Sequence, residues 1–413
     1  MDAKKISEHV YAIHADICST ALFEGIWPIP SGVTLNSYVV KSEKTALIDF
    51  MRDWEDAPSK LEAQCRSIGV SLHKIDYLIL NHLEPDHAGH IRMFKEMNPG
   101  VEIIATKKGI NLVRNFFKIQ DNLREVKTGD TLDLGGGIVL SFMETPNIHW
   151  PETMMSYEIS EQILFSGDAF GTFGTINGGV LDSQTRLEFY KDEMRRYYSN
   201  IVGKYSSMVQ KAFAKVAGVP IQMICSLHGP VWKDHVAEVI SMYDRWSRYE
   251  AEPGVMIAYA SMYGNTARMA DHIAMLMAQK GVRDIVVHDV SKTHISYLIN
   301  DIWKYRGVIL GSCAYNSEMF PPMEALCRDM VHMQVKNKTL GLFGGYSWNG
   351  GGVRNLCKWA EEIGWEQVAP AVEMHGRPTA EKYAACEELA SAMAAKLLGG
   401  EGYKPAEPCT PVE

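Results

Sequence analysis

The sequence predicts two domains, a strand-rich α+β domain followed by an α/β domain with a doubly wound parallel sheet. Short β-branched and aromatic runs, punctuated by Gly, Asp and Asn, dominate residues 1 to about 180. After Glu252-Pro253-Gly254, apolar strands alternate with helical segments at roughly one unit per 25–30 residues, which is typical of a parallel sheet. The length of 413 residues also suits two or three domains. We therefore expect domains over residues 1–252 and 253–399 and a loose tail over 400–413.

The first domain is expected to be built from short strands separated by turns. The runs that predict strands are Asn36–Ser42, Lys44–Phe50, Ile75–Leu80, Glu102–Thr106, Ile138–Glu144, Met155–Ser160 and Gln162–Phe165. Helical patterns lie at Trp54–Ile68 and Gly109–Phe117. Longer amphipathic patterns follow near Arg186–Val216 and Asp234–Glu250, separated by the strand-like Gln222–Ser226. Glu252-Pro253-Gly254 is predicted to break the chain and to mark the domain boundary.

The second domain is expected to contain a parallel sheet. Its predicted strands are Val255–Ala260, Asp284–Asp289, Gly307–Ser312 and Thr339–Gly344. Helical segments separate these strands, as the crossovers between parallel strands require. Beyond the last helical pattern, three prolines in Gly399–Glu413 predict a loose tail.

Composition excludes several classes of function. A net charge of −9 argues against a nucleic-acid partner, which needs a basic surface. No apolar run approaches the roughly 18 residues of a membrane span, and the N-terminus lacks the apolar core of a signal peptide. The eight cysteines contain no Cys-x-x-Cys pair, which argues against a disulfide framework, a zinc ribbon or a rubredoxin-type centre. A cytoplasmic protein without membrane or nucleic-acid partners is expected.

The stretch Asn81–His90, "NHLEPDHAGH", predicts a metal site. It follows the apolar run Tyr77–Leu80 and contains the pattern His82-x-Glu84-x-Asp86-His87. In an extended segment, side chains two residues apart point the same way, so the first three can converge while His87 turns toward a second position. Such clusters of imidazole and carboxylate groups are typical of metal ligands.

Three further segments strengthen this prediction, because each ends or follows a predicted strand. They are Asn147–Pro151 with His149, Phe165–Asp168 with Asp168, and Ser226–Pro230 with His228. Their glycines and prolines fit tight turns that aim a polar side chain at a common point. Seven side chains are too many for one ion, whereas two ions about 3.5–4 Å apart, bridged by a carboxylate, would use them all.

The order of these four segments resembles the metallo-β-lactamase fold, which implies an αββα sandwich with ligands on strand-end loops. The zinc hydrolases of that superfamily usually carry His-x-His-x-Asp-His, but this chain has Glu84 at the second histidine position. Together with Asp86 and Asp168, Glu84 makes the site rich in carboxylates. Such a mixed oxygen and nitrogen site favours iron or manganese over zinc.

Three loops at the predicted strand ends of the second domain favour a flavin mononucleotide site. "SMYGNTA" after the first strand offers hydroxyl and amide groups at a helix N-terminus, without a dinucleotide or P-loop signature. This hydroxyl-rich loop is similar to the phosphate loop of a flavodoxin, in which FMN lies at the switch point of the sheet. The candidate FMN contacts are Ser261, Met262, Gly264, Asn265, Thr266, Ser312, Ala314, Tyr315, Asn316, Gly344, Tyr346, Trp348 and Gly350.

Both halves together resemble the flavodiiron proteins over nearly the whole chain. The resemblance implies that one iron takes His82, Glu84 and His149, that the other takes Asp86, His87 and His228, and that Asp168 bridges them. These seven residues would also be the catalytic set. It further implies reduction of O2 to water, of NO to N2O, or both, with electrons relayed by FMN.

The resemblance also implies partners. A head-to-tail homodimer, or a dimer of such dimers, is expected to bring the flavin of one subunit to the irons of the other. A separate rubredoxin or reduced coenzyme F420 is the expected electron donor. Two alternatives stay open at this point: a zinc-dependent hydrolase fused to a flavodoxin domain, and an electron-carrying flavoprotein whose first domain serves only for docking.

One position departs from the family pattern. Many flavodiiron proteins carry a histidine near the metal pair in a Phe-His-Gly stretch, but this chain reads Phe23-Glu24-Gly25. Glu24 replaces a neutral or cationic neighbour by an anion, so the preference between O2 and NO is left open. His90 matches no ligand position and is expected to lie at the surface or behind the ligands, and Asn81 and Trp150 are candidates to orient or shield them.

Overall fold

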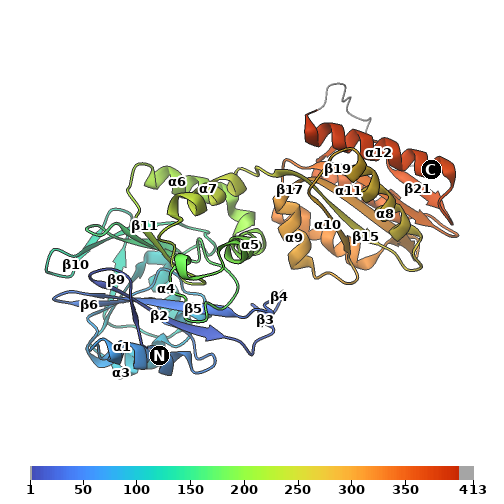
Figure 1. Cartoon of the computed structure of the whole chain (residues 1–413). Helices are drawn as coiled ribbons and strands as arrows, with labels where there is room; N and C mark the ends of the chain where they lie inside the picture. The colour runs from blue at the N-terminus through green and yellow to red at the C-terminus, as the bar shows by residue number, and fades with distance from the viewer. Residues whose placement is uncertain (1, 400–413) are drawn as a thin grey trace. The chain divides into compact units, whose positions relative to one another are not determined.

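Two facing β-sheets form the core of the first part of the chain (Figure 1). The computed structural model describes residues 2–399, and the chain divides between Ser247 and Arg248 into two units. The first sheet has the order β1-β2-β5-β6-β7-β8-β9 and the second the order β10-β11-β12-β13-β14. The ring centroids of Tyr38 and Phe165 lie 5.4 Å apart across the interface between the sheets. A small hairpin, β3 with β4, stands apart from both sheets.

The strands of the first unit are β1 (Lys4–Lys5), β2 (Val10–Ile17), β3 (Leu22–Phe23), β4 (Trp27–Pro28), β5 (Val33–Lys41), β6 (Thr45–Ile48), β7 (Tyr77–Ile79), β8 (Glu102–Thr106), β9 (Leu123–Val126), β10 (Thr131–Asp133), β11 (Val139–Glu144), β12 (Met154–Glu158), β13 (Ile163–Gly167) and β14 (Met223–Ser226). Its helices are α1 (Ala57–Ser67), α2 (Pro85–Ala88), α3 (Ile91–Met97), α4 (Lys107–Phe116), α5 (Leu187–Tyr197), α6 (Ser206–Val216) and α7 (Val236–Ser247). A π-helical turn and a 3₁₀ turn join α5 to α6.

Helices cover the outer faces of both sheets. α1 packs against β2 and β5, and α4 against β8 and β9, while α6 and α7 lie over β11, β12 and β13. The unit is therefore the αββα sandwich that the sequence predicts. Every predicted strand run of this domain overlaps an observed strand, but the sequence analysis did not predict β1–β4, β9 and β10.

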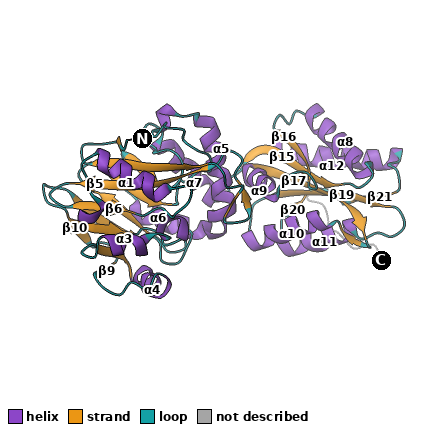
Figure 2. Cartoon of the chain, turned by 90° about the horizontal axis from the view of Figure 1, so that it is seen from below, coloured by secondary structure: helices purple, strands orange, loops and turns teal. Residues whose placement is uncertain are grey.

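The second unit is a doubly wound sheet with the order β16-β15-β17-β19-β20. Its strands are β15 (Glu252–Ala260), β16 (Ile285–Asp289), β17 (Tyr305–Tyr315), β18 (Glu318–Met319), β19 (Thr339–Tyr346), β20 (Glu366–Gln367) and β21 (Val372–His375). Its helices are α8 (Asn265–Gln279), α9 (Ile295–Lys304), α10 (Pro321–Met333), α11 (Gly352–Ile363) and α12 (Ala380–Leu398). α8 and α12 cover one face of the sheet and α10 and α11 the other (Figure 2). This strand order is that of the flavodoxin-like folds, and the parallel sheet that the sequence predicts is confirmed.

Glu252-Pro253-Gly254 does not break the chain, contrary to the prediction. These residues open β15, and a register shift between Glu252 and Val255 accommodates them. A proline is tolerated at the first positions of a strand because its missing N–H is not needed there. Gly254 lies against the ring of Tyr305, where a Cβ atom would come within 2.3 Å of ring carbon Cδ1.

Within residues 2–399, none of the helices has the length and apolar character that crossing a membrane requires. The predicted tail at 400–413 lies outside the described residues.

Candidate functional site

The His82 segment forms a turn and a short helix directly after β7. Strand β7 ends at Ile79, and Pro85 begins α2, where the proline's missing N–H costs no hydrogen bond. This change from extended to helical backbone presents His82 and Glu84 before the helix and Asp86 and His87 on it. Asp86 and His87 are buried, and Glu84 is partly buried.

The other three predicted segments end at the same place. His149 lies in the loop between β11 and β12, Asp168 follows the last residue of β13, and His228 follows β14. β13 and β14 pair in parallel, so their carboxyl ends meet at one edge of the sheet. Gly229, with a φ of +73°, packs against Thr172, where a Cβ atom would lie 2.0 Å from Oγ1. The turn after His228 therefore requires glycine.

All seven predicted side chains converge in two groups. His82, Glu84, His149 and Asp168 form the first group, and Asp86, His87 and His228 form the second; within each group the possible ligand atoms lie within 4.8 Å of one another. In the first, Nε2 of His149 lies 3.0 Å from Oε2 of Glu84. In the second, Nε2 of His87 lies 2.9 Å from Nε2 of His228.

Asp168 stands between the two groups and faces both. Its Oδ2 lies 3.2 Å from Nε2 of His149 in the first group. Its Oδ1 lies 3.2 Å from Nε2 of His87 in the second. One oxygen toward each group is the arrangement expected of a carboxylate that bridges two ions.

The charges and unpaired atoms of the site fit bound cations. Oδ1 and Oδ2 of Asp86 and Oδ1 of Asp168 are buried and accept no hydrogen bond. A buried carboxylate is costly unless it is paired or coordinates a metal. Three carboxylates and four imidazoles form a mixed oxygen and nitrogen donor set, which suits iron. The residues present therefore fit a pair of iron ions.

The histidines and carboxylates also stabilise one another electrostatically. Burial alone would raise the pKa of Asp168, but the nearby His82 and His87 outweigh it and hold that pKa well below its usual range. Burial alone would lower the pKa of His87, but the carboxylates of Asp86 and Asp168 outweigh it and raise the pKa to about 10. The carboxylates therefore favour positive charge at the imidazole nitrogens, which protons or bound cations can supply.

Three groups that sequence reasoning missed contact the predicted ligands His82 and His228. Oε1 of Glu152 lies 3.0 Å from Nδ1 of His82 and accepts a hydrogen bond from the Leu83 N–H. The carbonyl oxygen of Thr34 lies 2.9 Å from Nδ1 of His228. Oδ1 of Asp49 accepts from the His82 N–H at 3.3 Å. The proximity of Glu152 to His149 in sequence was the only local signal.

The residues expected to orient or shield the ligands take different positions. Oδ1 of Asn81 accepts from Oγ of Ser156 and so joins the two sheets. The ring of Trp150 meets His82 edge-on, with centroids 5.4 Å apart, and covers it. His90 stacks on Phe50 instead, with ring centroids 6.5 Å apart, and belongs to neither group.

Glu24 lies beside the cluster, at the tip of the β3–β4 hairpin. Its backbone is left-handed, with a φ of +51°. Its Oε2 accepts a hydrogen bond of 2.8 Å from Nε1 of Trp27. Glu24 is exposed as a residue, but its carboxylate lies close to Glu84. Loss of surrounding water and the charge of Glu84 raise the pKa of Glu24 to about 7.

A second pocket, of about 100 Å³, lies at the carboxyl ends of β15, β17 and β19. Six of the predicted FMN contacts line it: Ser261, Met262, Asn265, Thr266, Ala314 and Tyr346. It is also lined by residues that were not predicted: Tyr263, Cys313, Gly345, Ser347, Met374 and Gly376. Tyr263, Cys313, Gly345 and Ser347 belong to the three loops that were predicted to bind FMN, whereas no motif pointed to Met374 or Gly376.

The remaining predicted contacts lie around this pocket but do not line it. Gly264, with a φ of +88°, precedes α8, and no side chain caps that helix, so its first N–H groups face the pocket loop. Oγ of Ser312 accepts from the Phe320 N–H. Gly344 packs beneath the Ser312 carbonyl, where a Cβ atom would lie 2.1 Å from the oxygen. Tyr315 is the last residue of β17, and Asn316, Trp348 and Gly350 lie in the loops that follow β17 and β19. Tyr315 and Trp348 are exposed.

An uncapped helix N-terminus beside hydroxyl groups fits a phosphate monoester. Unsatisfied N–H groups and the helix dipole together favour an anion at this position. Thr266 is almost completely buried, and Ser261 accepts a hydrogen bond from the Gly264 N–H. The flat, partly aromatic remainder of the pocket suits a planar ring.

Comparisons with known proteins agree with both halves. Residues 33–229 match the family described as ODP family beta lactamase, and residues 257–389 match flavodoxin. The anaerobic nitric oxide reductase flavorubredoxin of Escherichia coli O1:K1 is 31% identical over 361 residues, covering 86% of this chain and 74% of that protein.

Solved structures match over nearly the whole chain. Rubredoxin oxygen:oxidoreductase from Desulfovibrio gigas superposes with a TM-score of 0.90 at 28% identity, covering 96% of this chain and 99% of that one. The flavodiiron protein of Giardia intestinalis gives a TM-score of 0.87 at 24% identity, over 97% and 98% of the two chains, and shows the shared fold. Fold and site together define a two-domain oxidoreductase with a beta-lactamase-like and a flavodoxin-like domain. The chain belongs to the flavodiiron protein family, and this prediction is confirmed.

Proposed function

We propose that this protein reduces NO, O2 or both at a non-haem di-iron centre, with electrons relayed by FMN. The observation that carries the proposal is Asp168, whose two oxygens face two separate groups of ligand atoms. Relatives named for nitric oxide reduction and for oxygen reduction support this reaction class.

The ligand assignment follows from the two groups. We assign His82, Glu84 and His149 to one iron and Asp86, His87 and His228 to the other, with Asp168 as the bridge. Two ferrous ions held here would supply reducing electrons and open coordination positions for a diatomic gas. Glu152 and the Thr34 carbonyl would fix the rings of His82 and His228, so that each presents Nε2 to its ion.

The flavin would take the pocket beside α8. We assign the FMN phosphate to the N-terminus of α8, near Ser261 and Thr266, and the ring to the side of Tyr346. The Tyr346 ring stacks on His375, with centroids 4.9 Å apart, which would fix its plane.

Neither the zinc-dependent hydrolase nor the electron carrier with a docking domain is favoured. Glu84 adds an oxygen donor where the zinc hydrolases carry a nitrogen donor, and the relatives named above are reductases. A first domain that served only for docking would not need seven converging ligand side chains.

The proposed partners are an electron donor and a second copy of the chain. We infer that a separate rubredoxin or reduced coenzyme F420 delivers electrons to FMN; the name of the Desulfovibrio relative supports rubredoxin. We also infer a head-to-tail homodimer, or a dimer of dimers, that brings each flavin to the partner's irons. Mass photometry showing a fully active monomer would contradict the dimer. Rapid reduction by NADH alone would contradict the separate donor.

We place the protein in the cytoplasm. Among residues 2–399 the cysteines are free thiols, of which Cys18 is exposed, and this fits a reducing compartment.

The proposed function is tested on protein purified without oxygen. Iron, zinc and FMN are measured per subunit, and consumption of NO and of O2 is followed with an artificial electron donor. Two irons, one FMN and reduction of at least one gas are expected. Zinc without iron, or iron without reduction of either gas, would overturn the proposal.

A further inference from the structure

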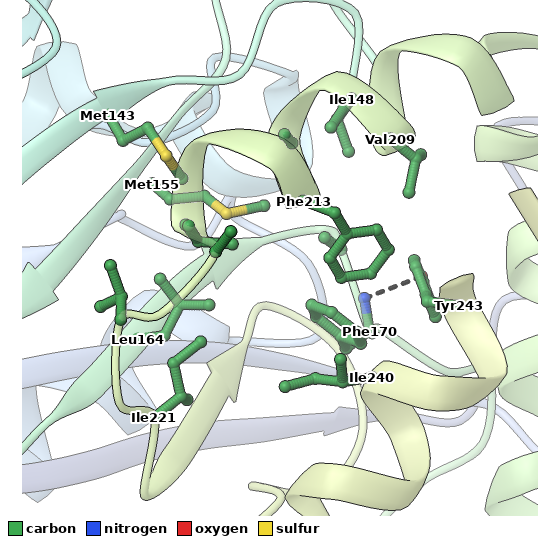
Figure 3. A pocket seen from close by; sticks show the side chains of 15 residues that line it. Met143, Ile148, Met155, Leu164, Phe170, Val209, Phe213, Ile221, Ile240 and Tyr243 are labelled. Atoms are coloured by element: carbon green, nitrogen blue, oxygen red, sulfur yellow. Dashed lines mark hydrogen bonds between the residues drawn. The ribbon is translucent and has the colours of Figure 1, made fainter.

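An apolar cavity of about 240 Å³ lies in the first unit, between β11–β13 and helices α6 and α7 (Figure 3). Met143, Met155 and Leu164 line it from the sheet, and Val209 and Ala212 line it from α6. Figure 3 shows the side chains of Met143, Met155, Leu164 and Val209 around a common interior, together with those of Phe213 and Ile240. Hydroxyl and charged groups are almost absent from the described lining; Tyr243 is the polar exception. Such a space is poorly suited to water, which needs two to four polar partners.

The cavity lining includes residues that adjoin two of the predicted ligands in the chain. Ile148 and Ala169 line it, and they are the chain neighbours of His149 and Asp168. The turn after β13 is held by a hydrogen bond from the Gly171 N–H to the Asp168 carbonyl. The same turn therefore presents Asp168 to the cluster and Ala169 and Phe170 to the cavity.

Phe170 is fixed in the wall of the cavity by several contacts. Its backbone N–H donates to the Tyr243 hydroxyl at 2.7 Å, drawn as a dashed line in Figure 3. Its carbonyl accepts from Nε1 of Trp232 at 2.9 Å, and its ring lies 4.3 Å from that of Tyr243 between centroids. The wall is thus built by buried, bonded residues and does not depend on an exposed loop.

The apolar space also continues toward the surface. A second cavity, of about 380 Å³, shares Met143, Met155 and Leu164 with the first. Its lining includes Ile159 and Val219, which are 46% and 39% exposed. A mainly apolar route therefore runs from solvent-exposed side chains to Ile148 and Ala169, the chain neighbours of His149 and Asp168.

We propose that this cavity is the entry pocket for the gaseous substrate, NO or O2. Both gases are small and nearly apolar, so they leave water for an apolar space more readily than charged or strongly hydrated molecules do. A cavity of about 150 Å³ lined by Leu, Ile and Phe stays dry and binds xenon or benzene, so this larger one can accept a diatomic gas. The inference rests on the proposed function, which supplies the gas as substrate.

The first experiment uses xenon as a probe in crystals of the wild-type holoenzyme. Xenon resembles the gases in size and polarity but does not react, so its binding is independent of catalysis. Xenon density in the cavity is expected. Absence of xenon there, or density for a bound hydrocarbon chain in its place, would overturn the proposal.

The second experiment fills the cavity. Ala212 is buried in α6, whereas Ala214 on the same helix is exposed, so Ala212→Met and Ala214→Met add the same side chain inside and outside the cavity. We expect Ala212→Met to lose xenon and to lower kcat/KM for the gas roughly three- to tenfold, with kcat at saturating gas unchanged. Ala214→Met should match the wild type in both. An unchanged kcat/KM in a variant that has lost xenon would overturn the proposal.

A filling variant on another helix covers the case in which Ala212→Met fails to fold. Ile240 of α7 is only partly buried, so Ile240→Phe can extend into the cavity with less strain. Iron and FMN content confirm that each variant is loaded. Wild-type protein that binds xenon but reduces neither gas would refute the proposed function alone. Active protein whose filled variants keep the wild-type kcat/KM would refute the entry pocket alone.

Discussion

Nδ1 of His82 lies 3.0 Å from Oε1 of Glu152, and both side chains are completely buried. A buried carboxylate in this position accepts the Nδ1–H and leaves Nε2 as the coordinating atom. Partners of this kind fix the tautomer and the ring orientation of metal-binding histidines. Glu152 would therefore act on the metal through His82, as a positioning residue.

Replacing Glu152 should weaken metal binding without removing a ligand. We expect Glu152→Gln to lower iron affinity about 10- to 100-fold and to leave FMN in place. Competition with an iron chelator measures the affinity. Glu158→Gln is the matched control, because Glu158 is equally buried but binds a surface turn at Ser160 and Glu161. Equal iron loss in both variants would show a general loss of stability and would contradict the assigned role.

Asp168 should be needed for both irons. Asp168→Asn keeps the shape of the side chain but removes the charge and one of the two oxygens that face the ligand groups. We expect iron at both positions to fall and reductase activity to disappear, while FMN stays at one per subunit. Asp182→Asn changes an equally buried aspartate outside the cluster and should keep its iron. Two irons and full activity in Asp168→Asn would contradict the bridging assignment.

Glu24 should lower the reduction potential of the irons. Its carboxylate lies against Glu84, and Trp27 donates a hydrogen bond that Glu24→Gln can keep. Well above the pKa of about 7, where Glu24 is ionised, this substitution removes a negative charge beside the centre and favours the ferrous state. At about pH 8.5 we therefore expect the midpoint potential to rise by roughly 60 mV, or about 1.4 kcal/mol per electron. A redox titration followed by electron paramagnetic resonance measures this change. Glu24→His tests in addition whether the ratio of NO to O2 reduction depends on this position.

Thr266 should contribute to flavin binding through its hydroxyl group. Thr266→Val keeps the shape of the buried side chain and removes the hydroxyl beside the α8 N-terminus. A hydrogen bond to a charged group contributes about 1.5–3 kcal/mol, so FMN affinity should fall roughly 10- to 100-fold. Fluorescence titration of the FMN-free protein measures it. Thr293→Val changes a threonine in the same unit but outside the pocket, and it should bind FMN as the wild type does. Equal FMN affinities of Thr266→Val and Thr293→Val would refute the phosphate assignment.

Lys338 should make the stability of the second unit depend on pH. Its Nζ donates to the carbonyls of Trp303 and Tyr305, and burial lowers its pKa from 10.5 to about 7. Between these two values the unfolded chain binds more protons than the folded chain, so the free energy of unfolding rises with pH. The slope approaches about 1.4 kcal/mol per pH unit, and it vanishes below pH 7, where both states are protonated.

Lys338→Met tests this dependence because methionine does not titrate. The Tm of the second unit is measured as the temperature at which FMN is released. The Tm of the wild type minus the Tm of the variant should increase from pH 7 to pH 9. A difference that stays constant across this range would show that the ammonium group is not desolvated.

The fold class and the seven candidate ligand positions could be predicted from the sequence. His82, Glu84, Asp86 and His87 are four residues of one short segment, and the strand-to-helix change there follows from local signals such as Pro85. The alternation of apolar strands with helical segments likewise predicted the parallel sheet. Such elements can be recognised because hydrophobic periodicity reflects local backbone geometry. Glu252-Pro253-Gly254 was misjudged because turn residues can also open a strand when packing, here against Tyr305, selects that conformation.

The surroundings of the candidate ligands could not be predicted from the sequence and depend on the packing of distant segments. Glu152 reaches His82 from 70 positions along the chain, and Thr34 meets His228 from 194 positions away. The apolar cavity likewise depends on how α6 and α7 pack over β11–β13. A side chain's preference for strand or helix is encoded locally, whereas these contacts exist only after distant segments have packed. Their identity therefore depends on the three-dimensional arrangement and not on any pattern along the chain.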